Sequence, residues 1–147
     1  MAEVDDFLTD VLPDYFAAEK ALRNGDAEPR KAMWSHEDPV TVFGAAVAKP
    51  GWAEIEPMFD WLASGFTDGR QSEHDIVAAG ASGDLAYIVA FEHTTASVAG
   101  APAEPYTLRV TTIFRRERGA WKVVHRHGDP LDDPAARLIV KRQRARL

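Results

Sequence analysis

Apolar side chains recur at helical spacing near the start of the chain, at Phe7, Val11, Tyr15, Ala18 and Leu22. Spacings of three to four residues place these side chains on one face of an α-helix, so the pattern predicts a helix over residues 4–24. Pro13 either kinks this helix or restarts it. The letters NGD at 24–26 end the helix, because glycine and asparagine are typical of helix ends.

Two further helices and a short strand are expected in the next part of the chain. Asp26 can cap a helix that runs to Met33, with Pro29 tolerated in its first turn. The β-rich letters VTVF at 40–43 predict a short strand. Helical spacing returns over residues 51–65, where Pro57 must fit near the start of the helix. The apolar face of this third helix carries Trp52, Ile55, Phe59 and Leu62.

From Ser72 onward the period changes to the alternation that is typical of β-strands. The predicted strands are EHDIVAAG, DLAYIVAFEHTT, YTLRVTTIFRR and AWKVVHRH, and the turn signals SGD, AGAPAEP and ERG separate them. Short turns indicate an antiparallel meander. Asp132 or Asp133 followed by Pro134 predicts a last helix whose end, KRQRARL, is basic. Helices first and strands afterwards predict an α+β fold.

Composition indicates one globular domain over residues 1–147, with a core of about residues 5–130 and a helix or tail over 132–147. The chain is 46% hydrophobic and 27% charged, and no apolar run approaches the roughly 18 residues of a membrane span. The acidic start, MAEVDDFLTD, lacks the order of a signal peptide, and there are no cysteines. We therefore expect a soluble, cytoplasmic protein.

The net charge of −6 is unevenly distributed, with 6 basic and 16 acidic side chains in residues 1–75 but 11 and 7 in residues 76–147. A basic half can indicate nucleic-acid binding. Here Arg115, Arg116 and Arg118 fall at a hairpin tip, other basic residues fall at the C-terminus, and no aromatic platform is interleaved with them. Neither a nucleic acid nor a membrane is expected as a partner.

The last hairpin, TLRVTTIFRRERGAWKVVHRHGD, carries polar side chains where a strand would bury apolar ones. A two-residue loop, Arg118-Gly119, would put Arg109 on the opposite face from both histidines. A three-residue loop from Glu117 to Gly119 gives glycine the left-handed position and shifts the register by one residue. We expect the three-residue loop, which places Arg109 opposite His127 on the inner face of the sheet. Thr111 then lies opposite His125, followed by Ile113, Val123 and Trp121.

A buried guanidinium needs a counter-charge, because desolvating an unpaired charge costs several kcal/mol. Glu92, late on the preceding strand, and Asp38, in SHEDPVTVFG, are the candidate partners of Arg109. Two interpretations remain open. The polar side chains form either a satisfied buried network or the lining of a pocket.

The order of segments resembles one known group of proteins over about residues 5–130. After the long helix come NGD, MWSHEDPVTVFG, GWAEIEPMF, GDLAYIVAFE and LRVTTIFRRERGAWKVVHRH. This order is similar to the SnoaL-like or DUF4440 branch of the nuclear-transport-factor-2-like superfamily. The resemblance implies a cystatin-like cone, in which N-terminal helices pack in the concave face of a strongly curved antiparallel sheet. It also implies a deep pocket at the wide end and, commonly, a dimer formed by sheet faces.

The superfamily includes ketosteroid isomerases, limonene epoxide hydrolases, scytalone dehydratase, polyketide cyclases and the association domain of calcium/calmodulin-dependent protein kinase II. Fold does not choose among these activities. The kinase domain binds small carboxylates through pocket arginines, but the corresponding positions here are Thr111, Glu92 and Gly128. Asp38, Arg109 and Glu92 loosely resemble the water-activating Asp-Arg-Asp set of limonene epoxide hydrolase. Ketosteroid isomerases use a carboxylate base opposite a hydrogen-bonding tyrosine and acid pair, and this set has no residue-for-residue match here.

These residues predict a small-molecule-binding protein without a cofactor, possessing isomerase, cyclase or hydrolase activity on a small, mostly apolar substrate. Arg109 would polarise a substrate oxygen, Glu92 or Asp38 would act as base, and His125 and His127 would transfer protons. No third ligand is marked that would complete a metal site with the two histidines. The alternative is a non-catalytic ligand-binding or oligomerisation module. The expected walls of the cavity are Tyr15, Trp34, Phe43, Trp52, Phe59, Ile88 and Thr111.

A homodimer is expected as well. With Arg109 on the inner face, Val110, Phe114 and Val124 form an apolar row on the other face of the meander. A soluble monomer rarely exposes such a row.

Overall fold

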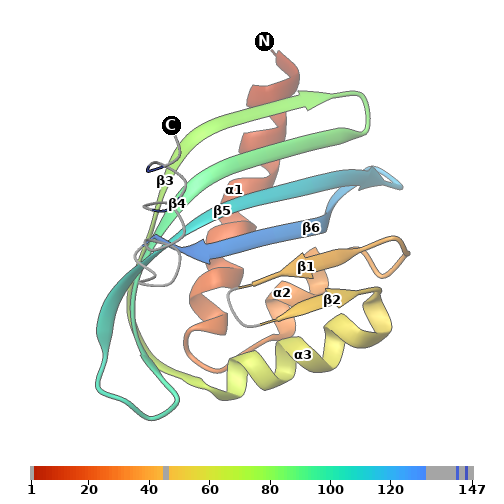
Figure 1. Cartoon of the computed structure of the whole chain (residues 1–147). Helices are drawn as coiled ribbons and strands as arrows, with labels where there is room; N and C mark the ends of the chain where they lie inside the picture. The colour runs from red at the N-terminus through yellow and green to blue at the C-terminus, as the bar shows by residue number, and fades with distance from the viewer. Residues whose placement is uncertain (1, 45–46, 132–141, 143–144, 146–147) are drawn as a thin grey trace.

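The computed structural model describes residues 2–44, 47–131, 142 and 145, and it confirms the predicted α+β fold (Figure 1). The helices are α1 (Ala2–Leu22), α2 (Glu28–Met33) and α3 (Trp52–Ser64). The strands are β1 (Thr41–Phe43), β2 (Ala48–Pro50), β3 (Phe66–Ser82), β4 (Leu85–Val98), β5 (Glu104–Glu117) and β6 (Ala120–Pro130). The helix expected from residue 132 onward lies outside the described residues.

One boundary and one short strand differ from the sequence prediction. β3 starts at Phe66, directly after α3, instead of near Ser72, and its register shifts against β4 between Thr67 and Gln71. Such a shift interrupts the alternation that marks a strand. The short β2 was not predicted, and it pairs with β1 across Val42 and Lys49.

The six strands form one sheet in the order β2-β1-β6-β5-β4-β3. The β3–β6 meander is antiparallel throughout, as predicted, whereas β1 pairs with β6 in the parallel direction. Figure 1 shows the long strands curving around α1, with α3 below β1 and β2. This is the cone that the resemblance implied.

The apolar stripe of α1 forms the contact between this helix and the sheet. Phe7, Val11 and Tyr15 are all at most 5% exposed. The ring of Phe7 lies 5.0 Å from that of Phe114 on β5, in the edge-to-face arrangement that aromatic pairs prefer. None of the described helices is long and apolar enough to cross a membrane.

The turn between β5 and β6 has two residues, so the prediction of a three-residue loop is wrong. Glu117 pairs with Ala120, and both turn residues have positive φ angles, 51° for Arg118 and 81° for Gly119. A turn with two positive φ angles matches the right-handed twist of the flanking strands, and glycine in its second position favours it.

A β-bulge at Val124 then reverses the faces of β6. Phe114 pairs with Val123, but Ile113 pairs with His125, so Val124 is an extra residue in the ladder. Beyond the bulge, Arg109 lies opposite Asp129 and Thr111 lies opposite His127. One extra residue exchanges the two faces of a strand. Val123 therefore points into the core, whereas His125 and His127 point away from the helices.

Arg109 and Thr111 also lie on this outward face, so their predicted place on the inner face is wrong. The apolar row expected to be exposed is the inner row instead: Val110 is 3% exposed and Phe114 is fully buried against α1. Val110 and Phe114 therefore cannot contribute to a dimer surface, contrary to the prediction.

Candidate functional site

The described strands aim two charged side chains at the interior of the cone, Glu92 on β4 and Arg126 on β6. They are 1% and 7% exposed and form a two-pronged ion pair. Arg126 Nη1 donates to Glu92 Oε2 at 2.9 Å, and Nη2 donates to Oε1 at 2.7 Å. The Tyr15 hydroxyl donates to Glu92 Oε2 at 3.1 Å and lies 3.1 Å from Thr112 Oγ1. His74 Nε2 approaches the same carboxylate oxygen at 3.4 Å.

A second buried ion pair joins α1 to α2. Arg30 Nη2 donates to both oxygens of Glu19, at 2.7 and 2.6 Å, and both residues are at most 4% exposed. Arg126 Nη1 lies 4.0 Å from Glu19, so the two pairs form one cluster.

Arg23, at the C-terminal side of α1, is the least satisfied member of this cluster. The side chain is buried, and it lies 3.5 Å from Glu19 and 3.8 Å from Glu92 without a hydrogen bond to either. Its guanidinium carbon sits 4.8 Å from the centre of the Phe66 ring, a favourable cation–π distance. A Cβ on Gly69 would come within 2.9 Å of Arg23 Cβ, so glycine at this position lets β3 pass close to the arginine.

The charges of the cluster are fixed by these contacts. Burial by itself favours the neutral acid, but the charge and hydrogen bonds of Arg126 hold the pKa of Glu92 well below its ordinary value. Burial also opposes ionisation of Glu19, yet the charges of Arg30 and Arg126 lower its pKa. Burial and the nearby Glu92 raise the pKa of Tyr15 well above its usual range. The site therefore holds two carboxylates and a neutral phenol.

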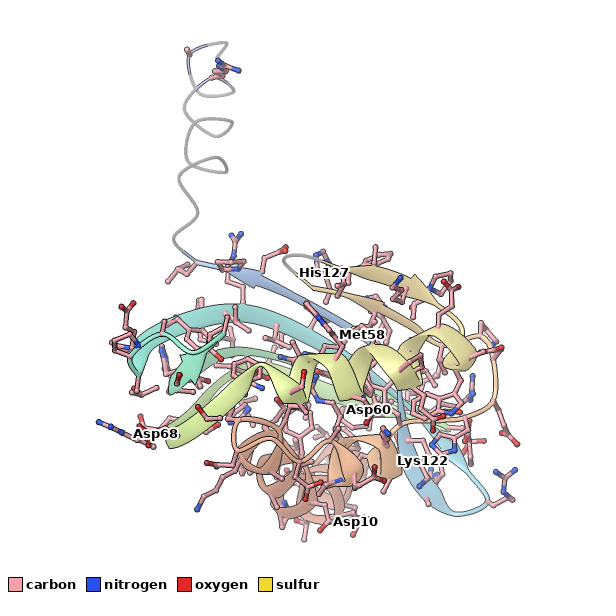
Figure 2. The ribbon with its side chains drawn as sticks, turned by 90° about the horizontal axis from the view of Figure 1, so that it is seen from below. Asp10, Met58, Asp60, Asp68, Lys122 and His127 are labelled. Carbon is pink, nitrogen blue, oxygen red and sulfur yellow. The ribbon has the colours of Figure 1, made fainter. Side chains whose placement is uncertain are left out.

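A cavity of about 350 Å³ lies beside the cluster, between α3 and the inner face of the sheet. Figure 2 shows Met58 on the side of α3 that faces the sheet and Asp60 on the side toward α2. Three arginines, Arg23, Arg30 and Arg126, reach the wall of this cavity. The remaining lining is mostly apolar: Val42, Phe43, Gly44, Val47, Met58, Trp61, Leu62, Phe66, Val98, Tyr106, Leu108 and Gly128.

Several residues predicted for the site lie elsewhere. Arg109 and His127 are exposed on the outer face, where His127 Nε2 lies 2.9 Å from Asp129 Oδ2. Burial lowers the pKa of His125, whose Nδ1 is hydrogen-bonded to Thr41 at 2.7 Å. Asp38 is exposed and accepts a hydrogen bond from the Trp52 backbone at the start of α3, at 2.9 Å. Glu92 consequently pairs with Arg126 instead of Arg109.

The predicted wall residues are divided between the cluster, the core and the cavity. Tyr15 belongs to the cluster, whereas Ile88 and Trp34 are core residues at 2% and 3% exposure. The Trp34 ring packs edge-on against Phe59 at 5.0 Å, and Trp52 stacks on His36 at 4.1 Å. Phe43 does line the cavity, and Thr111 lies on the outer face.

Sequence reasoning missed Arg23, Arg30, Arg126 and Glu19. A signal for two of them was present. Tyr15, Glu19 and Arg23 follow one another at intervals of four residues, so they share one side of α1 with part of its apolar stripe. A polar row beside an apolar stripe is usually solvated. The buried positions of these side chains emerge only when the sheet closes over the helix.

Comparison with known proteins identifies the fold. The model of the SnoaL-like domain matches residues 13–132 of the chain. A ketosteroid isomerase-like protein from Erwinia carotovora atroseptica is 15% identical. The match covers 86% of this chain and 97% of that protein, with a TM-score of 0.70. A nuclear transport factor 2-like superfamily protein from Salmonella enterica is also 15% identical. The match covers 88% of this chain and 92% of that protein, with a TM-score of 0.67. A protein with a cystatin-like fold from Nostoc punctiforme is 16% identical. The match covers 86% of this chain and 91% of that protein, with a TM-score of 0.67. No curated protein matches the chain.

Proposed function

The chain belongs to the SnoaL-like domain family of the nuclear-transport-factor-2-like superfamily, and on that premise we propose that its cone binds one small, mostly apolar molecule carrying an oxygen group. The observation that carries this proposal is the cavity of about 350 Å³, apolar on most sides and bordered by three arginines. This volume is at the small end of ligand sites, which generally combine apolar walls with a few polar groups that orient the ligand.

The charge state of the cluster favours binding over acid–base turnover. An isomerase, cyclase or hydrolase of the kind expected from the sequence needs a base with a pKa near the working pH. Glu92 does not meet this condition, because its pKa lies well below the ordinary value and both its oxygens accept hydrogen bonds from Arg126. The non-catalytic binding module is therefore our first choice, with Arg126 and Tyr15 maintaining the shape of the polar wall.

Filling the cavity is expected to weaken binding without unfolding the protein. A Cβ on Gly128 would meet Val110 Cγ2 at 3.5 Å, an ordinary contact, so Gly128→Leu should place its side chain in the cavity. Binding of octanol, measured by isothermal titration calorimetry, should fall at least about tenfold, a loss of about 1.4 kcal/mol. Thr111→Leu, which adds similar bulk on the outer face, is the control. Unchanged octanol affinity in a folded Gly128→Leu variant would contradict the proposal.

We also propose a homodimer, now on different residues from those expected. The outer face of the meander carries the exposed side chains of Val77, Leu85 and Tyr87 beside the half-buried Val89 and Phe91. A contiguous apolar surface of this kind is typical of an interface. Sedimentation at micromolar concentration should show a dimer that Tyr87→Asp converts to a monomer. A monomeric parent protein would refute this part of the proposal.

A further inference from the structure

The charges around the cavity do not balance. Arg23, Arg30 and Arg126 bring three positive charges to the cluster, while Glu19 and Glu92 bring two negative ones. Among these five side chains, each at most 7% exposed, one positive charge is left over. An uncompensated buried charge is costly, which makes such a site receptive to one negative charge.

Arg23, which reaches the cavity wall, also has unused hydrogen-bond donors. Among the described residues, Arg23 Nε, Arg30 Nε and the Tyr106 hydroxyl are buried and have no hydrogen-bond partner. All three residues line the cavity. Arg23 forms no side-chain hydrogen bond at all within the described part of the chain, although a guanidinium offers five N–H groups. Buried donors are nearly always paired in folded proteins, so the unused N–H groups of Arg23 call for an acceptor from outside the chain.

From these two observations we infer that the ligand is a monocarboxylate with a hydrocarbon body, and that Arg23 is the anchor of its carboxylate. The inference rests on the proposed function, because it concerns the same cavity. A carboxylate supplies one negative charge and two acceptor oxygens, which match the surplus charge and the planar fork of an arginine. An alcohol would leave the surplus positive charge without a counter-charge. A phosphate dianion would reverse the imbalance instead of removing it.

The hydrocarbon body would lie along the apolar part of the cavity. Val42, Met58 and Leu62 form its walls away from the arginines. Trp61, which also lines the cavity, is 61% exposed and so marks its opening to solvent. A ligand entering there would place its charged end at Arg23 and leave its apolar end toward Trp61.

A pair of probes with the same hydrocarbon chain tests the inference. Octanoate should bind at least about tenfold more tightly than octanol near neutral pH, measured by isothermal titration calorimetry on the full-length protein. Equal affinity for the two probes would overturn the carboxylate inference while leaving the proposed apolar site intact. Failure of both probes to bind would overturn the proposed function, and the inference with it.

Variants of Arg23 then locate the anchor. Arg23→Met should abolish the preference for octanoate over octanol, because it removes the charge and the N–H groups that a carboxylate would bind. Arg23→Lys keeps the positive charge but loses the planar guanidinium, so it should keep part of the preference for octanoate. This variant tests the anchor if Arg23→Met does not fold. Arg70→Met removes the same charge from an exposed pair with Asp68 and should keep the full preference. A full preference in either folded Arg23 variant would overturn the role of Arg23.

Discussion

Replacing Arg126 by methionine is expected to lower the free energy of unfolding by about 3–5 kcal/mol. The substitution leaves Glu92 charged, 1% exposed and without the two hydrogen bonds that it accepts from Arg126. The Tyr15 hydroxyl and Arg23, which remain near Glu92, cannot replace a two-pronged ion pair at 2.7 and 2.9 Å. Urea denaturation followed by circular dichroism measures the change.

The double variant Arg126→Met with Glu92→Leu should recover most of this loss, because it removes both charges and leaves no buried carboxylate from the pair. Arg109→Met is the matched control. It removes an arginine from the same sheet at an exposed position and should change stability by less than about 0.5 kcal/mol. If the double variant were as unstable as the single one, Arg126 would stabilise the fold through contacts other than its pair with Glu92.

Acid should destabilise the folded protein strongly, since it contains two buried carboxylates with lowered pKa values. Glu19 and Glu92 ionise more readily in the folded state than at their ordinary value of 4.5. A lowered folded-state pKa gives stability that is fully present above the unfolded pKa. That stability is lost as the pH falls from about 5 toward the folded pKa values. Denaturation curves recorded from neutral pH to about pH 2 should show the free energy of unfolding fall by several kcal/mol.

The same variants identify the groups responsible for the acid effect. Arg126→Met with Glu92→Leu lacks one of the two carboxylates, so its stability should fall less steeply in acid than that of the parent protein. Glu37→Gln, which removes an exposed carboxylate paired with Arg118, should leave the profile unchanged. A double variant whose profile runs parallel to that of the parent would show that Glu92 is not a source of the acid effect.

Periodicity along the chain was sufficient for most of the fold. The stripe from Phe7 to Leu22 predicted α1, and the spacing from Trp52 to Leu62 predicted α3. In each pattern the apolar positions recur over several helical turns or strand residues, so the type of element can be predicted from the spacing. β2 was missed because it has only three residues and owes its conformation to pairing with β1.

The residues of the candidate site could not be predicted from the alternation of apolar and polar side chains along the strands. Trp121 and Val123 on β6 point inward, and continuing their alternation would bring His125 and His127 inward as well. The bulge at Val124 adds one residue to the ladder, so every side chain beyond it changes face. Arg126 thereby reaches Glu92, and the histidines face outward.

The sequence by itself determined the helices, the meander and the family, because these follow from periods and segment order that are written locally along the chain. Only the tertiary structure decided which charged residues meet. Tyr15 and Glu92 are 77 positions apart and Arg126 is a further 34 positions along, and they become neighbours when the curved sheet closes over α1. Their burial then fixes their charges, because a carboxylate deep in the cone stays ionised only beside the guanidinium that the fold places there.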